Sequence, residues 1–291
     1  MFENGKPCPD PVTQGVRYAP RVHLRWLIET DVFPETAARV TAALDRRGIA
    51  HHRYHDAMRR SDLPPADAPV IFWGSLGAAY AERVARAYTP GAIGDAAPFH
   101  CSAYYPALRA HLANADAMFT TVRALVSDPG TVLAPIGSPA RVFVRPDSPL
   151  KPFSGRVIAT AALDRRALDH GYYYEDEELP IVVSTPKHVT REWRFVIAGT
   201  QVIAGCEYLA ARTGAGVEVP AAAAALAAEV AAGPMGPAPL YVLDVGEVDG
   251  SLRAMELNPF SGADFYDCDA DAIVEAASAV GARLYLAVQS R

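Results

Sequence analysis

Two short segments near the end of the sequence carry acidic and amide side chains within otherwise apolar runs. Asp244 lies within Val-Leu-Asp-Val, and Glu256 and Asn258 lie within Met-Glu-Leu-Asn. Residues two apart on a strand share a face, so Glu256 and Asn258 should point the same way. Their apolar neighbours indicate partial burial, and a buried pair of carboxylates is costly unless a cation neutralises it.

The turn between the two strands decides whether Asp244 joins this pair. A two-residue turn at Asp249-Gly250 would place Asp244 opposite Met255. A three-residue loop that also includes Ser251 would place it opposite Glu256, and the glycine can supply the left-handed residue that such a loop needs. In the second register two carboxylates and an amide oxygen converge, and these hard donors suit Mg²⁺. The alternative is a set of polar residues on the wet face of an ordinary hairpin.

The order and spacing of three segments along the chain form a wider pattern. The strands Leu-Asp-Val and Glu-Leu-Asn-Pro follow residues 192–197, Glu-Trp-Arg-Phe-Val-Ile. Residues 143–155 read Phe-Val-Arg-Pro-Asp-Ser-Pro-Leu-Lys-Pro-Phe-Ser-Gly. Together these segments resemble the ATP-grasp superfamily, and in particular a little-characterised bacterial and phage subgroup. In that subgroup an Arg and a Lys in one short segment replace the usual widely separated lysines.

The resemblance implies an α+β fold of the ATP-grasp type. A small N-terminal α/β unit at residues 1–92 would precede a central lobe at 93–184 and a C-terminal lobe at 185–291, with ATP between the last two. It covers the second half of the chain well and the first half only in general layout. Substrate contacts are therefore expected from the part of the chain where the resemblance is thinnest.

The resemblance also implies roles for individual residues. Magnesium would be held by Asp244, Glu256 and Asn258. The side chains expected to contact ATP phosphates and the reaction centre are Arg145, Lys151 and Arg194. The backbone of residues 180–184 would read adenine, and the other nucleotide contacts implied are Val182, Val183, Ser184 and Lys187.

The cations can also be judged from their surroundings. Arg194 lies in an otherwise apolar strand, where an unpaired cation would be costly, so it contacts phosphate, pairs with Glu192 or Glu207, or extends to the surface. Arg145 and Lys151 lie in a proline-containing segment that by itself is typical of a solvated loop. The charge of a triphosphate must be neutralised and positioned for phosphoryl transfer, which favours the phosphate interpretation.

The implied activity is ADP-forming ligation of a carbon–nitrogen bond through an acylphosphate, with a small-molecule carboxylate and an amine as substrates, an amino acid or a peptide among them. Three alternatives stay open: a small-molecule kinase, a nucleotide-binding module without turnover, and an RNA- or peptide-modifying partner in a phage or defence setting. Excluding water from the intermediate requires closure of a lobe or lid. The loop at residues 213–216 is a candidate lid.

Composition narrows the class of protein. The chain has 291 residues, 51% of them hydrophobic and 21% charged, which is typical of a globular protein with a substantial core. A net charge of -6 argues against a nucleic-acid partner. There is no signal-like start and no apolar run long enough for a membrane. Four scattered cysteines favour reduced thiols in the cytoplasm. The oligomeric state is left open, with a homodimer as one option.

The elements that must position these residues follow from periodicity and turn signals. The first part should contain parallel strands at 22–29, 49–54 and 70–73, with helices that begin at Pro34 and near Gly74, and a boundary turn at Pro90-Gly91. Residues 104–127 look helical, with Asn114 as a cap between two helices. The remaining expected strands are 141–145, 156–160, 180–184, 192–198, 201–208, 241–248 and 252–258. Helices are expected at 221–232 and from 271 onward.

Two further motifs were weighed. Asp267-x-Asp269-x-Asp271 begins like a calcium loop, but Ala272 and Ser278 stand where that loop needs Gly and Glu, so a cap for the last helix is the better interpretation. Residues 74–77, Gly-Ser-Leu-Gly, follow a strand and open a helix. They form either a tight structural turn or an anion site at a helix N-terminus.

Overall fold

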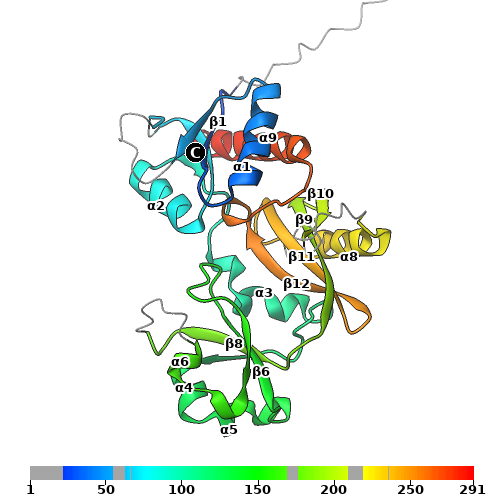
Figure 1. The fold of residues 1–291 in the computed structure, drawn as a ribbon. Coiled ribbons are helices and arrows are strands. Elements are labelled where there is room, and N and C mark those ends of the chain that lie inside the picture. Colours follow the sequence, from blue (N-terminus) through cyan, green and yellow to red (C-terminus); the bar gives the residue numbers. More distant parts are fainter. Residues whose placement is uncertain (1–21, 55–62, 66, 169–175, 209–218, 235) are drawn as a thin grey trace, which may run out of the picture.

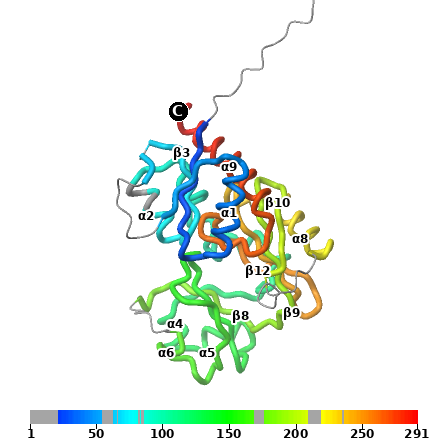
Figure 2. Tube along the Cα trace, turned by 45° about the horizontal axis from the view of Figure 1, so that its top comes forward, coloured from blue at the N-terminus to red at the C-terminus, as the bar shows by residue number. Residues whose placement is uncertain are grey.

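The computed structural model describes residues 22–54, 63–65, 67–168, 176–208, 219–234 and 236–291. Three four-stranded sheets follow one another along the molecule (Figure 1). The N-terminal sheet and the sheet built from residues 118–184 lie at opposite ends, and the sheet that contains Asp244 lies between them in both views (Figures 1 and 2). Among the described helices, none has both the length and the apolar character needed to cross a bilayer.

The first sheet is parallel, as expected, with the strand order β2-β1-β3-β4. Its strands are β1 (Arg25–Glu29), β2 (His51–Tyr54), β3 (Pro69–Trp73) and β4 (Thr89–Gly91). Helix α1 (Pro34–Arg46) begins with a proline whose fixed φ suits the first turn, and Gly48 follows it at φ +63°. Helix α2 (Leu76–Arg86) is capped by Ser75. The turn predicted at Pro90-Gly91 is wrong, because these residues pair with β3 as a fourth strand.

The last helix, α9 (Ala270–Gln289), packs on this first sheet rather than on its neighbours in sequence. Ile273 and Val274 share one buried cluster with Trp26 and Ile28. The Trp26 indole also donates a hydrogen bond to Ser278 (3.1 Å). Asp269 caps the helix through the backbone N–H groups of the following turn, which confirms the capping interpretation of the acidic triplet.

The second sheet is antiparallel, in the order β5-β8-β6-β7. Its strands are β5 (Met118–Thr121), β6 (Arg141–Pro146), β7 (Arg156–Ala159) and β8 (Pro180–Ser184). The short helices around it are α4 (Val122–Ser127), α5 (Pro129–Leu133) and α6 (Arg165–Leu168), with 3₁₀ turns η3 (Ala134–Ile136) and η4 (Thr160–Ala162). These elements enclose a core of their own.

The segment before this sheet differs from the expected pair of helices. Turn η2 (Ala97–Phe99) leads into α3 (Cys101–Leu108), and the chain then turns irregularly before β5 begins. Asn114 caps no helix; it is buried and accepts a hydrogen bond from the Ser184 hydroxyl (3.2 Å). Phe and Thr in β5 favour a strand over a helix, a preference that the apolar spacing had hidden.

The third sheet is antiparallel, in the order β10-β9-β11-β12. Its strands are β9 (Val189–Ala198), β10 (Gln201–Glu207), β11 (Leu240–Val248) and β12 (Ser251–Pro259). Helix α8 (Ala221–Ala232) packs on one face with α3, and η5 (Phe260–Gly262) follows β12. On the other face, apolar residues such as Val196 and Val242 pack beneath the N-terminal sheet. The polar residues predicted to form the site lie further along that second face.

The β11–β12 hairpin reaches the metal-binding register by a route that the sequence analysis did not foresee. The turn has two residues, Asp249 and Gly250, both at positive φ (+49° and +77°) as a type I′ turn requires. The three-residue loop is therefore wrong. A β-bulge at Met255 adds one residue to β12 and restores Asp244 to a position opposite Glu256.

Candidate active site

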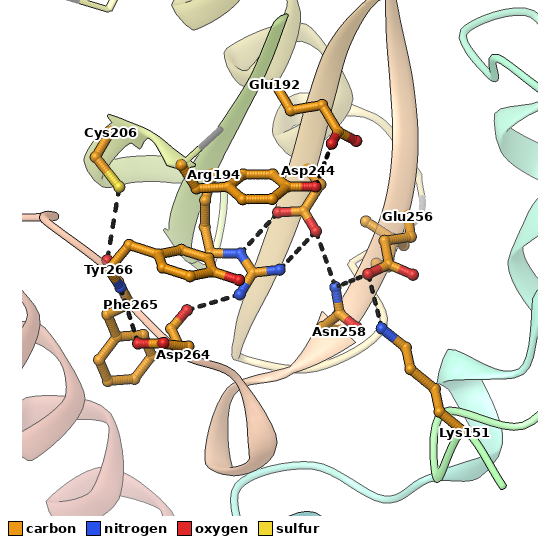
Figure 3. Close-up of polar contacts among 12 residues, drawn as sticks. Lys151, Glu192, Arg194, Cys206, Asp244, Glu256, Asn258, Asp264, Phe265 and Tyr266 are labelled. Carbon is orange, nitrogen blue, oxygen red and sulfur yellow. Dashed lines mark hydrogen bonds and ion pairs between the residues drawn. The ribbon is translucent and has the colours of Figure 1, made fainter. Parts of the chain in front are cut away.

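Three charged residues form a row across three adjacent strands. Arg194 of β9 lies opposite Asp244 of β11, which lies opposite Glu256 of β12. Opposite residues in an antiparallel pair share a face, so all three side chains project toward the second sheet. Figure 3 shows them together with Asn258.

Arg194 is held from several directions. Its Nε and Nη2 atoms donate to the two oxygens of Asp244 (2.8 and 2.7 Å), and Nη1 donates to the backbone carbonyl of Asp264 (2.7 Å). The rings of Tyr208 and Tyr266 stack on one another, and the guanidinium carbon lies 5.4 and 4.9 Å from their centroids. The partners considered from sequence, Glu192 and Glu207, are replaced by Asp244, because register places Asp244 directly opposite.

Asn258 connects the two carboxylates. Its Nδ2 atom donates to Asp244 Oδ2 (3.2 Å) and to Glu256 Oε1 (2.9 Å). A single atom within hydrogen-bond distance of both carboxylates marks a point where a cation would meet them, and rotation of the amide would bring its oxygen there. Two carboxylates and an amide oxygen are the donor set that Mg²⁺ accepts, so the residues present fit such an ion.

Two cations of the second sheet reach across to the same glutamate. Arg145 Nη1 lies 2.9 Å from Glu256 Oε2, and Lys151 Nζ lies 2.8 Å from Oε1. Arg145 comes from β6, and Lys151 lies in the loop after it at φ +47°, an uncommon conformation for a residue other than glycine. The segment that composition alone would assign to a solvated loop thus joins the two sheets at the site.

A cavity of about 370 Å³ separates the two sheets at this point. Gly155 is needed at its edge, because a Cβ atom there would come within 2.8 Å of the Phe143 ring. The residues that line the cavity are Asn114, Phe143, Arg145, Pro146, Lys151, Phe153, Ser154, Gly155, Glu192, Tyr208, Asp244, Met255 and Glu256. Acidic, basic and aromatic side chains thus face a common space.

The electrostatics of the acids follow from burial and partners. Burial raises the pKa of Glu256, but Lys151 and Arg145 outweigh it and hold that pKa below its usual value. Burial raises the pKa of Asp244, and Arg194 opposes the rise. Burial likewise raises the pKa of Glu192, whose carboxylate accepts a hydrogen bond from the Tyr208 hydroxyl. Protein cations therefore balance the acids next to the cavity.

The residues expected to contact the base do not line this cavity. Val182 and Val183 have β5 on one side and β6 on the other, so the sheet already pairs their backbone. The connector between the sheets begins only after Ser184, at residues 185–188. Lys187 of this connector forms an ion pair with Asp116 (2.8 Å). Contacts of these residues with a nucleotide stay a prediction.

Sequence reasoning missed several residues that the fold brings to the site. Glu192 precedes Arg194 by two positions on the same strand, so period-two alternation was a signal that could have included it. Tyr208 and Tyr266 lie at the end of β10 and in the loop after η5, where no periodicity marks them. Tyr266 has φ +44°, a second uncommon backbone conformation beside the site.

Two other sequence hypotheses have separate outcomes. The lid considered at residues 213–216 lies outside the described residues. At the start of α2, the backbone N–H of Ser75 donates to the carboxylate of Glu29 (2.5 Å), and the Ser75 hydroxyl accepts from Ala78. An internal carboxylate thus takes the helix N-terminus that had been considered for an outside anion.

The family comparison identifies most of the chain. Residues 75–276 match the model of an ATP-grasp domain family, which is described as family 3 of its clade. None of the curated proteins matches the sequence significantly.

Solved structures share the fold at low sequence identity. A RimK domain protein of the ATP-grasp type from Sphaerobacter thermophilus has a TM-score of 0.56 and 16% identity, over 86% of this chain and 98% of that one. D-alanine–D-alanine ligase from Bacillus anthracis, complexed with ATP, has a TM-score of 0.55 and 14% identity, over 90% and 98%. The ATP-grasp ligase PsnB, complexed with a minimal precursor, Mg and ADP, has a TM-score of 0.51 and 12% identity, over 89% and 97%.

Proposed function

The chain belongs to this family of ATP-grasp domains, and from this premise we propose that it is an ADP-forming ligase that joins a carboxylate to an amine. The observation that carries the proposal is the meeting of Glu256 from one sheet with Arg145 and Lys151 from another beside a shared cavity. The solved relatives are named as ligases, one of D-alanine and one complexed with a precursor, which supports an amino acid or a peptide as substrate class.

We assign the metal to Asp244, Glu256 and Asn258. A magnesium ion held there would supply positive charge to the phosphate oxygens of ATP. Arg194, Arg145 and Lys151 would exchange their carboxylate partners for phosphate, because each is already oriented toward the cavity by its contacts with Asp244 or Glu256. These three cations then spread the charge that develops during phosphoryl transfer.

The proposed reaction has two steps. A carboxylate oxygen of the substrate bonds to the γ-phosphorus of ATP while the bond to the bridging oxygen breaks, and ADP leaves. The amine nitrogen then bonds to the acyl carbon, phosphate leaves, and the nitrogen loses a proton. The aromatic rings of Phe143 and Phe153 limit the access of water to the space in which the acylphosphate would form.

We also propose that the chain divides at residues 92/93 and 184/185. The connector after Ser184 supports the second division. Helix α9 belongs to the last part in sequence but packs on the first, so the parts are interleaved in space. Adenine contact by the end of β8 and by Lys187 belongs to the same proposal.

The test combines substrate screening with variants of the acidic pair. Purified protein is incubated with Mg²⁺, ATP and a panel of amino acids and short peptides, and ADP, phosphate and product mass are followed. An amide product with ADP supports a ligase, whereas a stable phosphorylated product indicates a kinase, and ATP binding without ADP release under any amine indicates a binding module.

Asp244→Asn and Glu256→Gln should abolish Mg²⁺-dependent ADP formation while circular dichroism and cooperative unfolding are kept. The matched control is Glu247→Gln on the same hairpin, because Glu247 bonds Thr190 and does not line the cavity. Normal turnover in both acidic variants would exclude the metal assignment.

A further inference from the structure

Two cysteine side chains meet at the end of the charged row. Cys206 of β10 lies opposite Arg194 in the register, and Cys268 lies in the segment between η5 and α9. Both are free thiols, and their Sγ atoms are 3.0 Å apart. A disulfide bond is about 2.05 Å long, so the sulfurs need to approach by only about 1 Å.

The surroundings of the two sulfurs differ in a way that suits stepwise oxidation. Both residues are buried, with Cys206 at 7% and Cys268 at 3% exposure, so Cys206 is the more accessible. The hydrogen bond from Cys268 lowers the pKa of Cys206 against the opposing effect of burial, whereas that bond and burial raise the pKa of Cys268. The thiolate is the reactive form of cysteine, which identifies Cys206 as the sulfur attacked first.

We propose that Cys206 and Cys268 form a redox site that a hydroperoxide converts into a disulfide. The thiolate of Cys206 attacks the peroxide, gains one oxygen as a sulfenic acid and releases hydroxide or an alcohol. The Cys268 sulfur then bonds to the Cys206 sulfur, and the sulfenic oxygen leaves as water. In total, two thiols lose two protons and two electrons, and the peroxide is reduced.

This disulfide would act on the charged row through its neighbours. Tyr208 lies two residues after Cys206, and Tyr266 lies two residues before Cys268. Their rings stack at 5.0 Å and hold Arg194 (Figure 3). A covalent bond between the two backbones keeps these rings, and with them Arg194, in the arrangement paired with Asp244. Oxidation should therefore weaken ATP binding, an effect that rests on the proposed function, whereas the disulfide itself does not.

The first measurement is chemical. Full-length protein in a Cys8→Ala background is treated with hydrogen peroxide, alkylated and analysed by intact mass and peptide mapping. We expect the loss of two hydrogen atoms, a cross-linked peptide pair that contains Cys206 and Cys268, and reversal by dithiothreitol. Cys206→Ala and Cys268→Ala should each abolish the cross-link. Cys101→Ala should keep it, because Cys101 is equally buried but contacts the Tyr104 hydroxyl (3.7 Å) rather than a thiol.

The second measurement is the affinity for Mg²⁺ and ATP of the reduced and oxidised proteins. A coupling between the disulfide and Arg194 predicts a dissociation constant at least about fivefold higher after oxidation, reversed by reductant. Overoxidation of Cys206 without a cross-link would overturn the disulfide. Equal affinities would overturn its coupling to Arg194. Failure of ATP to bind either form would count against the proposed function and leave the mass result to decide the disulfide.

Discussion

At the scale of single residues, the site is a set of charges whose partners depend on how deeply each lies. Arg194 is 7% exposed and makes a two-pronged contact with Asp244, which is buried as well. Arg191, three positions earlier on β9, makes a similar contact with Glu207, but more than a third of its side chain is exposed. Burial, rather than geometry, distinguishes the two pairs energetically.

Arg194→Met should therefore lower the free energy of unfolding by about 3–5 kcal/mol, because it leaves Asp244 buried without its partner. Arg191→Met should cost less than about 1 kcal/mol, since its ion pair is screened by solvent. Urea denaturation of both variants measures the difference. Equal losses in the two variants would show that the row is not held together by its buried pair.

The predictability of the site also differs from residue to residue. Asp244, Glu256 and Asn258 could be found from the sequence because polar residues in apolar strands are conspicuous. The partner of Arg194 could not be found, since it depends on which residue of β11 faces β9. Tyr266 belongs to a loop, and no local pattern indicates that its ring reaches Tyr208.

At the scale of elements, the hairpin of β11 and β12 combines a tight turn with an irregular strand. Its two-residue turn alone would place Met255 opposite Asp244, and the bulge shifts the pairing by one residue. Gly246 makes room for it, because a Cβ atom there would come within 2.8 Å of the Met255 sulfur. The expected pairing of Asp244 with Glu256 was thus right for a wrong reason, since a single extra residue in one strand leaves no periodic signal.

Deletion of Met255 should remove the bulge and leave Asp244 opposite Glu256, so that ATP affinity in the presence of Mg²⁺ changes only a few-fold. Deletion of both Ser251 and Met255 should place Leu257 opposite Asp244 and abolish that affinity, because a one-residue slip reverses the faces of a strand. Isothermal titration with Mg²⁺ and a non-hydrolysable ATP analogue tests both variants. Retention of affinity in the double deletion would contradict this account of the register.

Other elements show where local patterns were sufficient. The parallel strands and α1 were predicted well because proline, glycine and apolar runs mark them clearly. Strand β5 was taken for helix because its four residues lie within a longer stretch that has helical spacing. Strand β4 was taken for a turn because it is three residues long and contains both proline and glycine.

At the scale of the whole molecule, Glu256 joins two sheets that have separate cores. Its partners Arg145 and Lys151 belong to the sheet at one end of the molecule, and Glu256 itself belongs to the middle sheet (Figure 1). The pKa of Glu256 lies below its usual value because of these cations. The stability that this carboxylate contributes is therefore present above the unfolded pKa of about 4.3 and is lost as the pH falls through the lower folded value.

The stability difference between the wild type and Glu256→Gln should thus be constant from neutral pH to about 5.5 and shrink as the pH falls below about 4.3. Urea unfolding without nucleotide, measured across this range, gives the two curves. Glu275→Gln serves as the control, because Glu275 makes an exposed ion pair with Arg47 that contributes at most about 1 kcal/mol. A constant difference down to the lowest pH would contradict the bridging role of Glu256.

The docking of α9 onto the first sheet has a consequence for biosynthesis. Trp26 and Ile28 leave the ribosome early, but Ile273 and Val274, which cover them, are among the last residues translated. At about 5–20 residues per second, the apolar face of β1 waits roughly 10–50 s for its cover. Throughout that interval the nascent chain presents two large side chains to the solvent, and only the final helix allows the opening segment to settle.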